Sequence, residues 1–306
     1  MAGEGAGRAW VGVALALLSV SIWAGYFVTG RAAALSGIDA FDLTALRIGV
    51  SGIVLAPVAW RTRRALSPGR VAFFVTTAGA PYVLIAFQAL AYAPAAHGAV
   101  LQPGTVPLFA AALGAAWLGE RIGRRRAVGL ALCAAGVVAV GWHGLASAAP
   151  GAWIGYAMFV TGALGWAWYT VAARAWAVAP WAVAAALSTW SAILYLPPYF
   201  AVFGLRLAAL PWRELLFHAA YQGLATGIVA LAAWSRAVAL LGPARCGAFT
   251  VLVPCFAALL AWPILGEAIG PVEGAGIAAV VAGLWVTLDL RRRPAQGISG
   301  RPVSGR

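Results

Sequence analysis

The chain contains one stretch of sequence twice. Residues 107–120 read PLFAAALGAAWLGE and residues 254–267 read PCFAALLAWPILGE, an offset of 147 residues (254 − 107). In both copies an apolar run of helix length begins at a proline and ends at Leu-Gly-Glu. Glycines beyond the motif keep the same register, in the matched pairs Gly129 and Gly276, and Gly136 and Gly283. A repeat at this spacing indicates a duplicated half and predicts that function lies between two related halves.

A second match extends the duplication toward the N-terminus. The sequence WAGY begins at Trp23 and is followed by Arg31, and WAWY begins at Trp166 and is followed by Arg174. The offset is 143 residues (166 − 23), close to the first, so both matches belong to one duplication. A cleaved signal peptide would have no such internal twin, and we therefore expect the first apolar segment to stay in the protein.

Composition places the chain in the membrane. It is 63% hydrophobic and 9% charged, whereas soluble domains carry about 25% charged residues. Ten apolar segments have roughly the 20 residues that cross a bilayer as a helix, and they are rich in Ala, Leu and Gly. Their expected spans are 9–30, 41–60, 71–92, 98–119, 127–143, 152–173, 181–203, 215–240, 246–266 and 274–290. The fold class predicted is an all-α polytopic membrane protein with ten transmembrane helices in two inverted five-helix repeats.

The arginines predict the orientation. The chain has no lysine, and with the N-terminus inside, 17 of the 21 arginines fall on the inner side. Only Arg31, Arg206 and Arg213 fall outside, and Arg47 lies within the second apolar segment. This bias predicts that both termini are cytoplasmic and that the halves, 1–146 and 147–293, have opposite orientations. Residues 294–306 are rich in Gly, Ser and Pro and are expected to be a disordered tail.

Several functions are disfavoured by what the sequence lacks. The net charge of +13 sits mainly in short loops, so it indicates topology and not nucleic-acid binding. Cys133, Cys246 and Cys255 fall inside apolar runs and predict neither a disulfide framework nor a metal site. The histidines His97, His143 and His218 are dispersed, so no catalytic set is expected and an intramembrane enzyme is disfavoured. We expect no cofactor and see no sign of an obligatory protein partner.

The acidic residues give no mid-membrane carboxylate. They are Glu4, Asp39, Asp42, Glu120, Glu214, Glu267, Glu273 and Asp289, and all are expected at helix ends or in loops. A carboxylate in the middle of a span would be a functional hypothesis by default. Proton exchange through such a group is therefore disfavoured, which leaves a uniporter or coupling through a less obvious group.

Longer motifs resemble a known family. Ala-Leu-x-Tyr-x-Pro-Ala at 89–95, followed by Pro107 and by Leu-Gly-Glu-Arg at 118–121, resembles the EamA-type signature of the drug/metabolite transporter superfamily. The second half repeats it with Gly-Pro-Ala-Arg at 242–245, Pro254 and Leu-Gly-Glu at 265–267. The resemblance covers nearly the whole chain and implies two inverted five-helix repeats in a bacterial inner membrane. The tryptophan-rich core is most similar to bacterial exporters of aromatic amino acids and paraquat.

Aromatic and amide side chains inside the spans are the candidate substrate site, because in inverted repeats the site lies near the midplane on corresponding helices. The predicted lining is Trp23, Tyr26, Tyr82, Gln88, Trp166, Tyr169 and Trp234. The alternatives are an interfacial aromatic belt for the rings and a helix-to-helix hydrogen bond for Gln88. Rings and amides suit a zwitterion with an apolar part, so we expect alternating-access export of aromatic or other neutral amino acids and related metabolites. A lipid or polyprenyl-carrier translocator and a multidrug exporter remain open, and no pore pattern supports a channel.

Overall fold

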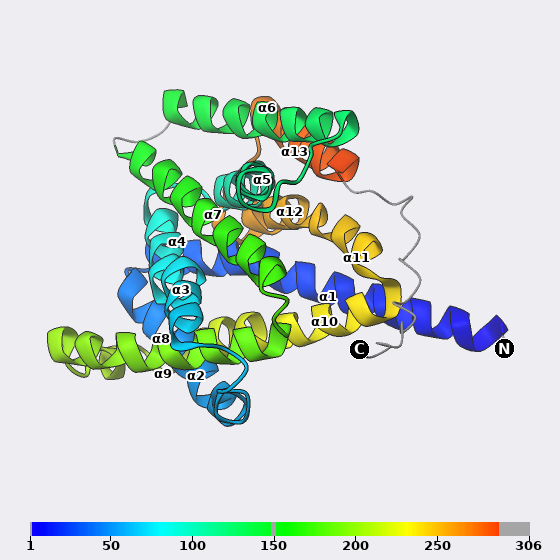
Figure 1. Ribbon diagram of the computed structural model, residues 1–306. Coiled ribbons are helices and arrows are strands. Elements are labelled where there is room, and N and C mark those ends of the chain that lie inside the picture. Colours follow the sequence, from blue (N-terminus) through cyan, green and yellow to red (C-terminus); the bar gives the residue numbers. More distant parts are fainter. Residues whose placement is uncertain (1, 148–150, 288–306) are drawn as a thin grey trace, which may run out of the picture.

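The computed structural model describes residues 2–147 and 151–287, and every regular element within these residues is helical (Figure 1). The tail predicted at 294–306 lies outside the described residues. The described helices follow all ten predicted segments, and the all-α polytopic fold class is confirmed.

Seven of the ten segments are single helices. They are α1 (Ala2–Leu35), α2 (Ala40–Arg61), α5 (Ala95–Leu118), α6 (Arg124–Ser147), α7 (Ala152–Ala175), α8 (Pro180–Phe203) and α13 (Pro271–Thr287). Three segments are divided: α3 (Pro68–Ala78) with α4 (Ala80–Tyr92), α9 (Trp212–His218) with η2 (Ala219–Val229) and α10 (Ala230–Leu241), and α11 (Pro243–Thr250) with α12 (Leu252–Leu265). A short 3₁₀ turn, η1 (Arg206–Ala209), precedes α9.

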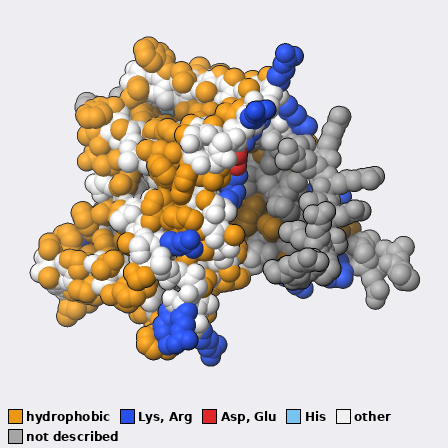
Figure 2. Space-filling view, in the orientation of Figure 1, with side chains coloured by type: hydrophobic (Ala, Val, Ile, Leu, Met, Phe, Trp, Pro, Cys, Tyr) orange, Lys and Arg blue, Asp and Glu red, His pale blue; other side chains and the backbone are white. Residues whose placement is uncertain are grey.

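Eight of these helical stretches in the described chain are long and apolar enough to cross a membrane. The other two are α7 and α13. The described α13 has 17 residues, and α7 contains tryptophans, tyrosines and glycines that lower its mean hydropathy. Apolar side chains cover most of the face seen in Figure 2, and arginines gather at a few places on it. Such a surface suits contact with lipid.

The repeated Leu-Gly-Glu motif is a helix end. Gly119 after α5 and Gly266 after α12 have φ of 66° and 69°, the left-handed conformation that glycine adopts without a steric penalty. The amide of the next residue then donates back to the last turns, from Glu120 to the Gly114 carbonyl and from Glu267 to the Ala261 carbonyl. A left-handed glycine cap ends both helices, which explains why the duplicated sequence stops at Leu-Gly-Glu.

The matched glycines bring α6 and α13 together. A methyl group added at Gly136 would lie 2.5 Å from the Gly276 carbonyl oxygen, and one at Gly129 would lie 2.7 Å from that of Gly283. Only residues without a side chain allow backbones to approach so closely. As the number rises along α6 it falls along α13, so these two equivalent helices pack antiparallel, side by side (Figure 1).

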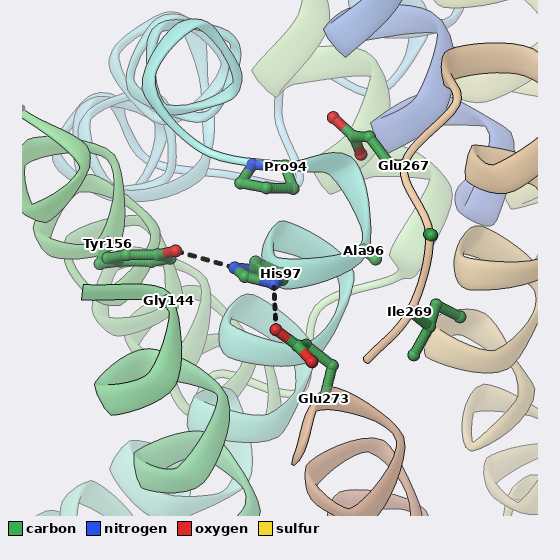
Figure 3. Close-up of a pocket in the computed structure, with 9 residues that line it drawn as sticks. Pro94, Ala96, His97, Gly144, Tyr156, Glu267, Ile269 and Glu273 are labelled. Carbon is green, nitrogen blue, oxygen red and sulfur yellow. Dashed lines mark hydrogen bonds and ion pairs between the residues drawn. The ribbon is translucent and has the colours of Figure 1, made fainter. Parts of the chain in front are cut away.

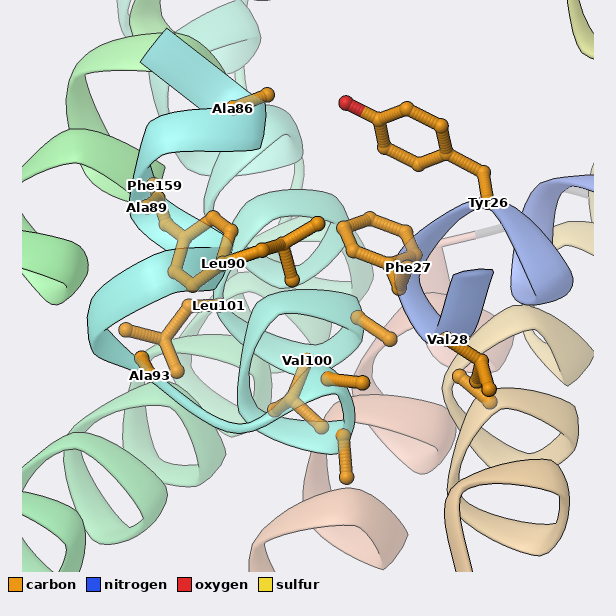
Figure 4. Close-up of a cluster of buried hydrophobic side chains, with 14 of the residues drawn as sticks. Tyr26, Phe27, Val28, Ala86, Ala89, Leu90, Ala93, Val100, Leu101 and Phe159 are labelled. Carbon is orange, nitrogen blue, oxygen red and sulfur yellow. The ribbon is translucent and has the colours of Figure 1, made fainter. Parts of the chain in front are cut away.

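The largest buried cluster joins the two halves. It contains Phe27 of α1, Leu90 of α4, Val100 of α5 and Phe159 of α7, together with residues of α12 and α13. Phe27 and Leu90 point toward one another from facing helices (Figure 4). The helices that carry the predicted site residues are therefore held by one continuous core.

Candidate functional site

Three of the predicted residues form a continuous row of rings between α4 and α7. The Trp166 ring centroid lies 5.2 Å from that of Tyr82 on α4 and 4.9 Å from that of Tyr169. Tyr169 then contacts Phe74 of α3 at 5.6 Å, edge to face. Distances of this size are typical of favourable aromatic pairs. The row connects the first half of the chain to the second.

A second pair of rings repeats the arrangement on the equivalent helix. Trp23 of α1 lies 5.2 Å from Trp234 of α10, centroid to centroid. Trp23 and Trp166 are the residues matched by the duplication, so each half uses the same position to contact a ring of the other half.

Tyr26 is buried and connects α1 to α4 and α2. Its ring lies 5.1 Å from that of Phe87, and the guanidinium carbon of Arg47 lies 4.8 Å from its centroid. Tyr82 also lies within electrostatic range of both Tyr26 and Arg47, so the three side chains share one region. The sequence prediction placed Arg47 within a span but did not include it in the site.

Polar atoms near this group lack partners. Gln102 of α5 donates from Nε2 to the Tyr82 hydroxyl at 2.7 Å. Buried side-chain atoms without a hydrogen-bond partner include Tyr26 Oη, Arg47 Nη1, Gln102 Oε1 and Thr105 Oγ1. An unsatisfied buried polar atom is costly and indicates a missing partner. Four such atoms on α1, α2 and α5 therefore mark this region as a candidate binding site.

The structure thus joins Tyr82, Trp166 and Tyr169 in one row, pairs Trp23 with Trp234, and places Tyr26 beside Arg47. Gln88 is half-buried, and no side-chain hydrogen bond to another described residue joins it to the group. The residues that the prediction missed, above all Arg47 and Gln102, carried a usable signal. Each is a strongly polar side chain in an apolar run.

A separate small cavity lies at one end of α5. It has a volume of about 240 Å³ and is lined by Pro94, Ala96, His97, Gly144, Tyr156, Glu267, Ala268, Ile269 and Glu273 (Figure 3). His97 Nδ1 lies 2.8 Å from the Tyr156 hydroxyl, and its Nε2 lies 3.8 Å from Glu273. His143 Nε2 lies 3.2 Å from the same carboxylate.

This cluster corrects the expectation that the histidines are dispersed. His97 and His143 lie on α5 and α6, and the packing of both against α13 brings them to Glu273. His218 stands apart, beside Glu214. In the described part of the chain, no group of three His, Cys, Asp or Glu side chains could hold a metal ion.

Comparison with known proteins decides the family. The EamA-like transporter family model matches residues 10–142 and again residues 153–289. The chain belongs to the EamA-like transporter family. It is 27% identical over 202 residues to a Bacillus subtilis (strain 168) protein named "Uncharacterized transporter YetK"; the match covers 62% of this chain and 59% of that protein.

The fold also has a solved counterpart. A crystal structure covers 96% of this EamA-like chain, and the chain covers 99% of that structure, with a TM-score of 0.62 and 22% sequence identity. At this identity the likeness concerns the fold alone. The family and the apolar helices establish a multi-pass membrane protein of the drug/metabolite transporter superfamily.

Proposed function

We propose that this transporter exports aromatic or other neutral amino acids, and related small metabolites, by alternating access across a bacterial inner membrane. The observation that carries the proposal is the row Tyr82–Trp166–Tyr169, whose rings come from both halves. Aromatic faces attract both apolar rings and ammonium groups. Beside the row lie amide and phenol groups with unfilled hydrogen-bonding capacity, which can orient a zwitterion.

The proposed mechanism follows from the duplication. The antiparallel packing of the equivalent helices α6 and α13 supports two repeats of opposite orientation. The arginine bias supports both termini in the cytoplasm. In such proteins a midplane site is exposed to either side by rocking of one repeat against the other. The rings of Trp23 and Trp166 occupy equivalent positions on α1 and α7 and would exchange roles as the repeats rock.

The test is transport by the purified protein in proteoliposomes. Efflux of labelled amino acids would be measured for aromatic, aliphatic, small and charged members, with and without a proton gradient. We expect saturable transport that is fastest for aromatic or other large neutral amino acids. If the protein instead moves only organic dications or labelled lipid carriers, the multidrug or lipid-carrier alternative replaces the amino-acid proposal.

A further inference from the structure

We propose that Arg47 binds a carboxylate of the transported molecule, so that the substrates are apolar or aromatic compounds that carry an anionic group. The inference rests on the proposed transport function and specifies the chemistry of its site. Four observations support it: the depth of Arg47, its lack of a counter-ion, the direction of its guanidinium and the donors around it.

Arg47 lies inside a span. It is the eighth residue of α2, about 10 Å along the helix from its first residue at 1.5 Å per residue. An arginine at such a depth is costly, and in membrane proteins it usually faces a substrate pathway or a partner charge. The guanidinium carbon lies over the Tyr26 ring at 4.8 Å, and Nη1 is closed off from solvent. The side chain therefore points into the protein.

No protein carboxylate neutralises this charge in the described part of the chain. All six carboxylates whose side chains are described lie beside basic side chains other than Arg47. Asp39 and Asp42 bind Arg206, Glu120 binds Arg126 and Arg174, Glu214 lies beside His218, Glu267 binds Arg31, and Glu273 lies between His97 and His143. Arg47 is half-buried, with Nη1 closed off from solvent and unpaired, and a sheltered charge without a counter-ion calls for an anion from outside the protein.

The groups beside Arg47 are hydrogen-bond donors. The Tyr26 hydroxyl is buried and has no partner. The Tyr82 hydroxyl accepts from Gln102 Nε2, so its own hydrogen is free to be donated. Two phenolic donors and a guanidinium fork match a carboxylate, which only accepts. On α5, the unpartnered Gln102 Oε1 is an acceptor and suits the ammonium of the same molecule.

Stacking on Tyr26 alone does not account for this arrangement. A cation over a ring satisfies none of the guanidinium N–H groups, and no hydrogen bond joins them to another described residue. If Arg47 served only for packing, an apolar side chain at this depth would stabilise the protein more than a charged one.

The test uses three probes that share an indole ring and differ in charge. They are tryptophan with both charged groups, indole-3-propionate with the carboxylate alone, and tryptamine with the amine alone. Binding to the purified full-length protein in detergent would be measured by equilibrium dialysis. We expect the two acids to bind at least about tenfold more tightly than tryptamine, as a charge-assisted hydrogen bond implies. In Arg47→Gln this preference should vanish, with tryptamine binding unchanged.

Two further variants make the test decisive. Arg236→Gln removes an exposed arginine of α10 and should leave all three affinities unchanged. Tyr26→Phe keeps the ring under Arg47 but removes the hydroxyl, and should weaken both acids by roughly threefold to tenfold while sparing tryptamine. If Arg47→Gln does not fold, the Tyr26→Phe variant serves as the test in its place.

The outcomes separate this inference from the proposed function. Arg47-dependent binding of indole-3-propionate without binding of tryptophan would remove the amino-acid proposal and keep the carboxylate site. Tryptamine binding as tight as that of the acids, or an equal loss of all three probes in both Arg47→Gln and Tyr26→Phe, would overturn the inference. Failure of the wild type to bind any of the three would overturn both.

Discussion

Arg31 of α1 and Glu267 after α12 form an ion pair between the two halves, with Nε and Oε1 3.0 Å apart. The residues that match them in the duplicated sequence, Arg174 and Glu120, form a second pair, also at 3.0 Å. Glu267 also accepts from the Ala95 amide at the start of α5, whereas Glu120 follows its end. The two pairs thus lie at opposite ends of a 24-residue helix, about 36 Å apart. Each half's arginine binds the other half's glutamate.

The two ion pairs should differ in their contribution to stability. The side chains of Arg31 and Glu267 are each 17% exposed, whereas those of Arg174 and Glu120 are 52% and 28% exposed. We expect Glu267→Gln to destabilise the protein by about 1–3 kcal/mol, because it weakens a sheltered charged contact. Glu120→Gln should cost less than about 1 kcal/mol, as exposed pairs do.

Denaturation of both variants in the same detergent measures the difference. A double variant, Arg31→Gln with Glu267→Gln, should cost less than the sum of its two single changes, since the residues interact. Equal losses for Glu267→Gln and Glu120→Gln would contradict the account of the two pairs.

The close approach of α6 and α13 predicts that Gly136 tolerates no side chain. Gly136→Ala would press a methyl group against the Gly276 carbonyl oxygen, and we expect a loss of about 1–3 kcal/mol from overpacking. Gly141 lies on the same helix with no atom within 4 Å of an added methyl, so Gly141→Ala is the matched control. It should be neutral or slightly stabilising, as alanine favours helices over glycine. Thermal unfolding that ranks the two variants the other way would refute the packing.

Topology can be tested by cysteine labelling from outside the cell. We expect an impermeant thiol reagent to miss cysteines introduced at Ser67 and Gly123, because the neighbouring arginines predict cytoplasmic loops. Gly123 has no atom within 4 Å of an added methyl, so a side chain there is accessible once the membrane is opened. Labelling of intact cells at either position would contradict the inverted arrangement. Cysteines at both positions should label fully after permeabilisation.

Glu273 provides a test of whether transport is coupled to protons. It is the carboxylate between His97 and His143 in the cavity of Figure 3, and its Oε2 is buried without a partner. Because no carboxylate is expected in the middle of a span, we predict that Glu273→Gln leaves transport largely intact, both in counterflow and under an imposed proton gradient. Proteoliposomes assayed with and without the gradient measure this. Loss of gradient-driven accumulation, with counterflow and folding preserved, would identify Glu273 as a proton carrier and overturn the prediction.

Much of the fold was predictable because membrane helices leave strong local signals. The ten segments, the proline-to-Leu-Gly-Glu motif and the matched glycines all appear in the sequence as length, hydropathy and register. The break between α3 and α4 at Gly79, next to Pro81, follows from a proline that removes a helix hydrogen bond. The π-helical widening at Ala219–Val229, which packs against α2 and α1, has no comparable signal in the sequence.

The candidate site was harder to predict. Trp23, Trp166 and Tyr169 were selected because they are duplicated, and duplication can be seen in one sequence. The proposed role of Arg47 depends on the absence of a carboxylate partner among the described residues. The contacts of His97 and His143 with Glu273 depend on the packing of three helices. Such relations arise only from tertiary packing. The seven predicted lining residues stay a prediction until substrate binding is measured.

Counterflow of labelled tryptophan in proteoliposomes tests the central claim most directly, by comparing Trp166→Ala with Trp190→Ala. Trp166 is 36% exposed and joins the rings of Tyr82 and Tyr169, whereas Trp190 on α8 is 45% exposed and contacts no other ring of the described residues. One aromatic contact is worth about 0.5–1.5 kcal/mol, so Trp166→Ala should weaken apparent affinity for tryptophan roughly threefold to more than tenfold, and less for alanine. Trp190→Ala should match the wild type. Unchanged tryptophan affinity in a correctly inserted Trp166→Ala protein would contradict a substrate site at these rings.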